Sequence, residues 1–307
     1  MWNQTPETCD QGLKLVRFVR ESNDAHLGLV LGDEVIDLGF KSPITFLTEA
    51  EASGESEEDY LRSAFDLERL RRYPYSDSDE NTQRSLGLSI PLLPPEVWAC
   101  GVTYTRSRAA RETETAVKGV YDRVYDAERP EVFFKGTAHR CVGPSEPVCI
   151  RSDSKWTVPE AELAVVMGAE EKVLGYTVGN DVSARDIEGA NPLYLPQAKI
   201  YEASCSLGPA IVTPNSLRNA KDLKIAISIA RGEEVVFQGE TNTSLMKRDP
   251  DELMKFLVRD NPVPLGSVCL TGTGIVPPDD FTLADGDVTE ISIEKIGTLR
   301  NLVKQLK

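Results

Sequence analysis

Histidine is scarce in this sequence: His26 and His139 are the only two among 307 residues. The scarcity argues against a zinc motif of the HExxH type, a histidine-rich zinc site and an iron site of two histidines and a carboxylate within one chain. A Ser-His-Asp triad has at most two candidate bases. Any chemistry is therefore expected to depend on carboxylates, lysine and a hard metal ion.

Basic residues are fewer than acidic ones, and long apolar runs are lacking. Lys and Arg number 34 against 49 Asp and Glu, and the formal net charge of −15 opposes binding to nucleic acid or to an anionic membrane surface. No run of 18 apolar residues occurs, and residues 1–7 have no basic or apolar region, so we expect neither a membrane span nor a signal peptide. The six cysteines form no CxxC pair and are predicted to be reduced thiols of a cytoplasmic protein.

What is present is a succession of short apolar runs separated by Gly, Pro, Asn and Asp. This pattern predicts an α+β fold that is mainly β, because the long helices of a doubly wound parallel sheet are missing. The predicted strands are residues 13–18, 27–31, 34–38, 132–134, 161–167, 173–178, 210–212, 223–229, 234–237, 268–270 and 288–293.

Prolines interrupt the chain at Pro91, Pro94 and Pro95, just before an apolar run. They predict a boundary between a small N-terminal α+β domain, residues 1–90, and a catalytic domain, residues 91–307. The alternative is a long loop within one domain.

Three helices are predicted. The strongest signals follow Asp249, which is placed to cap a helix that has Pro250 at its first position and Glu252 at its third. Weaker patterns indicate helices near residues 59–72 and 107–117.

Carboxylates gather around two of the predicted strands. Glu160 and Glu162 lead into an apolar strand, on which both side chains point to one face and repel each other unless a cation lies between them. The next strand ends in Asp181, and Lys199 follows in a stretch flanked by apolar residues. Three carboxylates without His or Cys are typical of a site for Mg²⁺, Mn²⁺ or Ca²⁺. The alternative interpretation is a solvated strand end.

The order Glu160-x-Glu162, Asp181 after 19 residues and Lys199 after 18 more resembles the fumarylacetoacetate hydrolase superfamily, over roughly residues 90–307. The strings ELAVV from residue 162, GYTVGNDVSARD from 175, LGP from 207 and LTGTG from 270 agree with it. The resemblance implies a β-roll catalytic domain, a homodimer or homotetramer, and Mg²⁺ (or Mn²⁺) on the three carboxylates. In that family the metal binds a small-molecule 2-oxo acid substrate.

One position departs from the hydrolases of this superfamily. They have a histidine a few residues after a Gly-x-x-Tyr string, whereas Ser107 follows that string here. The usual base that activates water for C–C hydrolysis is then missing. The strings at residues 129–135 and 186–199, with Lys247-Arg248, are similar to a subgroup that dehydrates 2-keto-3-deoxy-D-arabinonate or 2-keto-3-deoxy-D-xylonate to 2,5-dioxopentanoate.

The resemblance implies roles for single residues. Lys199 is expected to remove a C3 proton and Glu131 to protonate the leaving C4 hydroxyl, although the two roles are exchangeable. Contacts to the substrate are expected from Ser107, Tyr194, Gln197 and Thr273. The prediction is a metal-dependent 2-keto-3-deoxy sugar acid dehydratase, a hydro-lyase. The alternatives are an acylpyruvate-type C–C hydrolase or 2-oxo acid decarboxylase of the same superfamily, and a non-catalytic metal-binding protein.

Overall fold

The structure is a computed structural model that describes residues 12–19, 24–39, 42–76, 85–106, 124–169, 171–217 and 219–307. Ser107 and the helix predicted near residues 107–117 lie outside these residues. The described chain consists mostly of strands with short helices, so the prediction of a mainly β member of the α+β class is confirmed.

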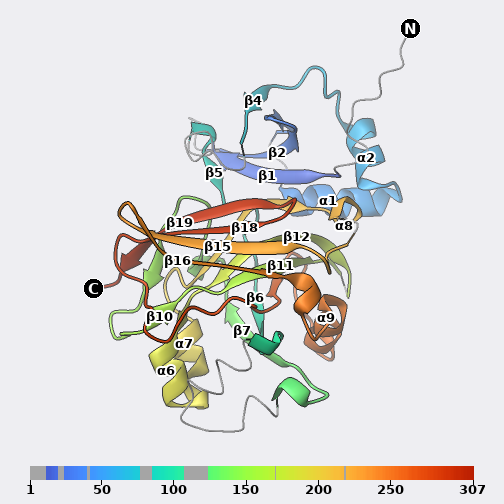
Figure 1. The fold of residues 1–307 in the computed structure, drawn as a ribbon. Helices are drawn as coiled ribbons and strands as arrows, with labels where there is room; N and C mark the ends of the chain where they lie inside the picture. Colours follow the sequence, from blue (N-terminus) through green and yellow to red (C-terminus); the bar gives the residue numbers. More distant parts are fainter. Residues whose placement is uncertain are drawn as a thin grey trace.

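A twelve-stranded sheet runs through the molecule (Figure 1). Strands β5 (Leu88–Ser89) and β8 (Cys141–Val142) pair with β1 and β14 beside its main path. The path consists of β4 (Arg72–Pro74), β3 (Glu34–Asp37), β2 (Ala25–Leu31), β1 (Lys14–Val19), β14 (Cys205–Val212), β12 (Val173–Asp181), β11 (Ala161–Met167), β17 (Val268–Leu270), β6 (Val97–Gly101) and β7 (Glu131–Gly136).

A second sheet covers one face of β11 and β12 (Figure 1). Between the two layers lie apolar side chains that alternate along the strands, among them Leu163, Val165, Ile227 and Ile291. Their burial removes apolar surface from water and holds the layers together. The second sheet has the order β16 (Glu234–Asn242), β15 (Lys224–Arg231), β18 (Val288–Ile293), β19 (Gly297–Gln305) and β9 (Val148–Ile150), and a separate pair joins β10 (Thr157–Val158) to β13 (Ser183–Ala184).

The N-terminal strands belong to the twelve-stranded sheet. Strand β1 pairs antiparallel with β14, with Leu15 opposite Ile211. Apolar residues from both sides of residue 90, including Leu29 and Leu207, share one buried cluster. The boundary predicted near residue 90 falls between β5 and β6 of this sheet, and the division into two domains stays a prediction.

The helices are short and lie at the ends and flanks of the sheets (Figure 1). In the described part of the chain, no helix is long and apolar enough to cross a membrane. The described helices are α1 (Pro43–Ser53), α2 (Glu57–Ala64), η2 (Ala138–Arg140), α6 (Arg185–Ala190), η3 (Pro192–Tyr194), α7 (Leu195–Lys199), α8 (Pro214–Leu217), η4 (Thr243–Leu245) and α9 (Pro250–Val258).

Two helix predictions had different outcomes. The helix after Asp249 is confirmed as α9, and the Asp249 side chain accepts a hydrogen bond from the backbone N–H of Asp251 at 3.0 Å. The helix predicted near residues 59–72 was wrong in its second half, because α2 ends at Ala64 and residues 72–74 form β4. Phe65 adopts extended backbone angles and packs against the apolar cluster of the N-terminal strands, which ends the helix.

Candidate metal and active site

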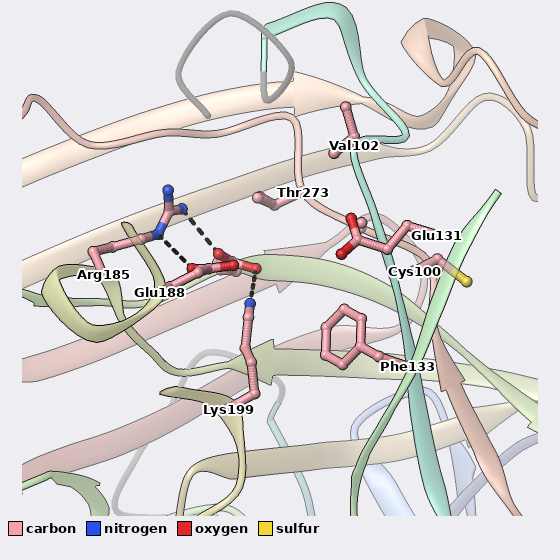
Figure 2. Close-up of a pocket in the computed structure, with 11 residues that line it drawn as sticks. Cys100, Val102, Glu131, Phe133, Arg185, Glu188, Lys199 and Thr273 are labelled. Carbon is pink, nitrogen blue, oxygen red and sulfur yellow. Dashed lines mark hydrogen bonds and ion pairs between the residues drawn. The ribbon is translucent and has the colours of Figure 1, made fainter. Parts of the chain in front are cut away.

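A small cavity opens where β6, β7 and the start of β11 approach helices α6 and α7 (Figure 2). It contains both charged and apolar side chains. Its lining consists of Cys100, Gly101, Val102, Glu131, Phe133, Glu160, Arg185, Glu188, Lys199, Gly272 and Thr273.

Strand pairing brings the three predicted metal ligands together. Glu160 precedes β11, Glu162 is its second residue, and Asp181 is the last residue of the neighbouring strand β12. The backbone N–H of Asp181 donates to the carbonyl of Glu160 at 3.0 Å, which joins the two strand ends. One carboxylate oxygen of each residue lies within 4.8 Å of the others, and all three residues are buried. The grouping predicted from the spacing is therefore present in the structure.

The electrostatics of this cluster suit a cation. Burial raises the pKa of Glu162 well above its usual range, and the neighbouring carboxylates of Asp181 and Glu160 raise it further. Two groups lower the pKa of Glu162: the charge of Lys199, and the backbone N–H of Gly272, which donates a hydrogen bond to a Glu162 oxygen at 2.5 Å. Three buried, mutually repelling carboxylates without a thiol or imidazole form an oxygen-only donor set, which fits Mg²⁺ or Mn²⁺.

Formal charges around the cavity support the same conclusion. Five carboxylates and three basic groups line the cavity or touch the cluster, which leaves two negative charges that one divalent cation would neutralise. The acidic residues are Glu131, Glu160, Glu162, Asp181 and Glu188, and the basic residues are Lys135, Arg185 and Lys199.

Lys199 is the last residue of α7. Its side chain points into the carboxylate cluster, and the residue is 99% buried. Its Nζ atom lies 2.9 Å from Glu160 Oε2 and 2.8 Å from Asp181 Oδ2, and 2.6 Å from Ser183 Oγ. The Phe133 ring lies on another side, with its centroid 5.4 Å from Nζ. An amine held between carboxylates and an aromatic wall is placed to exchange a proton with a substrate atom in the cavity.

Glu131 reaches the same cavity from the opposite side (Figure 2). It begins β7 and pairs with Gly101 of β6. A Cβ atom on Gly101 would lie 2.0 Å from Glu131 Oε2, so a larger residue there would displace the carboxylate from this position. The two predicted proton-transfer groups, Glu131 and Lys199, therefore face one cavity.

The predicted substrate-binding residues are distributed differently. Thr273 lines the cavity, and its hydroxyl forms local hydrogen bonds with the backbone of Ile275 at 3.2 Å. Tyr194 is 44% exposed, Gln197 is also exposed, and neither is part of the cavity lining. The roles assigned to these residues stay predictions, and Ser107 lies outside the described residues.

Neither histidine of the sequence belongs to the cavity lining. His26 lies on β2, where its Nδ1 atom is 2.8 Å from Asp37 Oδ1. His139 lies on the short helix η2. The structure therefore offers no imidazole at the cavity to replace the one expected in hydrolases.

Four charged or aromatic residues of the site were not assigned roles from the sequence: Phe133, Lys135, Arg185 and Glu188. Arg185 donates to Glu160 Oε1 at 2.9 Å, and its Nε atom is 3.8 Å from Glu188 Oε2. Figure 2 shows the Arg185 and Glu188 side chains next to each other. Alternation along β7 was the available signal for two of them, because residues 131, 133 and 135 share one face of a strand.

Comparisons with known proteins agree with this site. Residues 97–304 match the family described as fumarylacetoacetate (FAA) hydrolase, C-terminal. The chain is 50% identical over 219 residues to 2-dehydro-3-deoxy-D-arabinonate dehydratase of Saccharolobus solfataricus, which covers 70% of this chain and 74% of the relative. It is also 50% identical over 215 residues to a probable 2-keto-3-deoxyxylonate dehydratase of Haloferax volcanii, with the same coverage.

A solved structure extends the likeness to nearly the whole chain. It is a 2-keto-3-deoxy-D-arabinonate dehydratase complexed with magnesium and 2,5-dioxopentanoate, with a TM-score of 0.80 and 39% identity. The match covers 96% of this chain and 99% of the solved one. With its buried carboxylate cluster and a family match over residues 97–304, the chain belongs to the fumarylacetoacetate hydrolase family.

Proposed function

We propose that this protein is a Mg²⁺-dependent hydro-lyase that converts a 2-keto-3-deoxypentonate to 2,5-dioxopentanoate. The observation that carries the proposal is the cavity itself, where Glu160 of the carboxylate cluster, Lys199 and Glu131 meet without a histidine. The relatives at 50% identity are named for dehydration of the arabinonate and xylonate forms of this substrate.

Glu160, Glu162 and Asp181 would hold the metal. When bound, Mg²⁺ supplies a Lewis acid for the carboxylate and keto oxygens of a 2-oxo acid, which makes the C3 protons more acidic. Lys199, as the free amine, accepts one C3 proton, and the electron pair of that C–H bond forms the C2–C3 double bond of an enolate. The enolate electron pair then forms the C3–C4 double bond. The C4–O bond breaks, and Glu131 gives its proton to the departing hydroxyl, so that water leaves.

Proton shifts complete the reaction. The Glu131 carboxylate accepts a C5 proton and the Lys199 ammonium returns its proton to C3, which gives an enol of the C5 aldehyde. Glu131 then gives its proton to C4 and accepts the hydroxyl proton, which gives 2,5-dioxopentanoate. The Lys199 ammonium holds the proton that it removed from C3 and can return it there. Burial of Lys199 and the Phe133 ring beside it keep bulk water away from these transfers.

The second candidate is an acylpyruvate-type C–C hydrolase or 2-oxo acid decarboxylase. Hydrolysis requires a base that activates water, and neither His26 nor His139 lines the cavity. Glu131 would have to take that role. The absence of an imidazole from the lining favours dehydration, because loss of water needs no activated water molecule.

The experiment is an assay for the aldehyde product. Purified protein with Mg²⁺ is given 2-keto-3-deoxy-D-arabinonate or 2-keto-3-deoxy-D-xylonate, and the product is oxidised by a semialdehyde dehydrogenase with NADP⁺. We expect NADPH formation that EDTA abolishes and added Mg²⁺ restores. No product from either epimer by Mg²⁺-loaded protein, together with cleavage of an acylpyruvate or oxaloacetate, would contradict the proposal.

We further infer that the enzyme is a homodimer or homotetramer of the cytoplasm, and that Mn²⁺ can replace Mg²⁺. These statements rest on the family resemblance and, for the compartment, on six cysteines without a CxxC pair. Light scattering on the eluate of a sizing column tests the assembly, and a monomer would contradict it. The NADP⁺-coupled assay with Mn²⁺ in place of Mg²⁺ tests the metal.

A further inference from the structure

Strand β7 contains a buried lysine that the proposed chemistry leaves unused. Lys135 is fully buried, and it follows the cavity residues Phe133 and Glu131 on β7, at a point where the pairing with β6 shifts register. Transfer of an ammonium group out of water costs several kcal/mol unless its donors are satisfied. The position of Lys135 therefore needs an explanation.

The three donors of this ammonium group have three oxygen atoms within reach. Nζ lies 2.6 Å from Asp181 Oδ1, 2.6 Å from the carbonyl oxygen of Lys199 and 3.0 Å from the carbonyl oxygen of Val182. Nζ donates hydrogen bonds to the two carbonyl oxygens and forms an ion pair with Asp181 Oδ1, so its three contacts form a tripod. Such a tripod fixes the positions of its three partners relative to one another.

These partners belong to two functional elements. Asp181 is a candidate metal ligand at the end of β12, and Val182 follows it directly. The Lys199 carbonyl lies at the last residue of α7, where backbone carbonyls have no partner within the helix and attract cations. Lys135 thus joins the strand end that presents a metal ligand to the helix end that presents the proposed base.

From this geometry we propose that Lys135 is a positioning residue. It fixes the Asp181 carboxylate for metal binding and the Lys199 backbone for proton transfer, without touching the substrate. The proposal deepens the proposed function and rests on it for its kinetic part, whereas its metal-binding part stands independently.

The test substitutes Lys135→Met, which keeps the length of the side chain and removes its charge and donors. Isothermal titration of the metal-free protein with MgCl₂ measures the affinity. We expect affinity at least 10-fold lower than wild type, since loss of a group that orients a metal ligand typically costs 10- to 100-fold. At saturating Mg²⁺, we expect kcat to fall about 100-fold, the order of effect of a displaced catalytic group.

Two further variants keep the result interpretable. Phe134→Leu alters the neighbouring residue on β7, which packs edge-to-face on Trp98 with ring centroids 5.4 Å apart and points to the opposite face of the strand. It is expected to lower the melting temperature and leave Mg²⁺ affinity unchanged. If far-UV circular dichroism shows that Lys135→Met does not fold, Lys135→Gln replaces it, with at least a threefold loss expected in both readouts.

The proposal is overturned if folded Lys135→Met binds Mg²⁺ as tightly as wild type or more tightly, because the ammonium then only competes with the metal. It is also overturned if kcat is unchanged, or if Phe134→Leu loses Mg²⁺ affinity to the same degree. Wild-type protein that binds Mg²⁺ but forms no aldehyde refutes the proposed function instead, and the MgCl₂ titration still decides on the contact between Lys135 and Asp181.

Discussion

Two regions of the twelve-stranded sheet bury different kinds of side chain: the N-terminal strands β1 to β3, and the ends of β11 and β12 at the carboxylate cluster. Around β1 to β3, Leu27, Leu29 and Ile36 are fully buried and pack on Phe46 of α1. Around the ends of β11 and β12, the buried side chains include three carboxylates, with Lys135, Arg185 and Lys199 against them. One sheet therefore has an apolar region and a charged region.

The difference shows which part of the fold supplies stability and which supplies chemistry. Apolar burial contributes about 25 cal/mol per Å² removed from water. Burial of an ion pair is often no more favourable than an apolar contact of the same size, because desolvation offsets the attraction. The charged region is thus a poor source of stability. Substitutions there should change activity, and substitutions in the apolar region should change the free energy of unfolding.

The largest effect is expected from Glu162→Gln, which keeps the shape of a candidate metal ligand and removes its charge. Mg²⁺ binding should fall below detection in a calorimetric titration, and aldehyde formation should fall by about 10³-fold or more, since the reaction needs the Lewis acid. Glu146→Gln is the matched control, because Glu146 accepts a hydrogen bond from the backbone N–H of Gly143 as Glu162 does from Gly272. Equal losses in both variants would count against a metal role.

The next effect separates Lys199 from Glu131. Lys199→Met is expected to lower aldehyde formation by about 10³-fold and Glu131→Gln by about 10²-fold, within the range for general acid–base groups. 2-Oxopentanoate has no C4 hydroxyl to lose, so exchange of its C3 protons in D₂O reports the first step alone. Nuclear magnetic resonance should show this exchange with Glu131→Gln and not with Lys199→Met. Exchange with Lys199→Met and not with Glu131→Gln would mean that Glu131 is the base and Lys199 is the acid.

A smaller effect, of a different kind, is expected in the apolar region. Leu29→Ala removes a fully buried side chain from β2 and should lower the free energy of unfolding by about 2–5 kcal/mol. Urea unfolding measures this change, and Leu31→Ala, at a half-buried position of the same strand, should cost less. The folded protein should keep its kcat and Mg²⁺ affinity. If Leu29→Ala has a lower kcat at urea concentrations that leave the protein folded, the distinction between the apolar region and the charged region is wrong.

The smallest effect is expected at the start of α1. The Ser42 hydroxyl accepts a hydrogen bond from the backbone N–H of Thr45 at 3.0 Å and caps the helix. Ser42→Ala should lower the free energy of unfolding by about 1 kcal/mol. Ser42→Gly should cost only a few tenths of a kcal/mol, since glycine is tolerated at this position. Identical unfolding midpoints for wild type and Ser42→Ala would show that the cap contributes nothing.

Prediction from the sequence succeeded where the signal is local. Strand β11 has the predicted bounds, residues 161–167, because apolar residues run through a strand buried on both faces. The strand β19 was missed, since Gly297–Gln305 mixes charged, polar and apolar residues and is stabilised by its pairing with β18. The helix at residues 59–72 was overextended because Phe65 packs into a core that the local pattern does not contain.

Residues close together in the chain can also point in different directions. Gln197 and Lys199 both lie on α7, two positions apart, which places them about 200° apart around a helix axis. Lys199 points into the cavity, so Gln197 faces away from it and is exposed. The contact of Gln197 with the substrate stays a prediction.

By itself, the sequence determined the kind of chemistry: a shortage of histidine, two glutamates alternating on a strand, an aspartate at the next strand end and a lysine beyond it. Tertiary structure decided which charges meet. Lys135 lies 46 residues before Asp181 in the chain and beside it in space, and Arg185 contacts Glu160 across 25 residues. Such contacts depend on how strands and helices pack, because ion pairs form between side chains that the fold brings within a few ångströms.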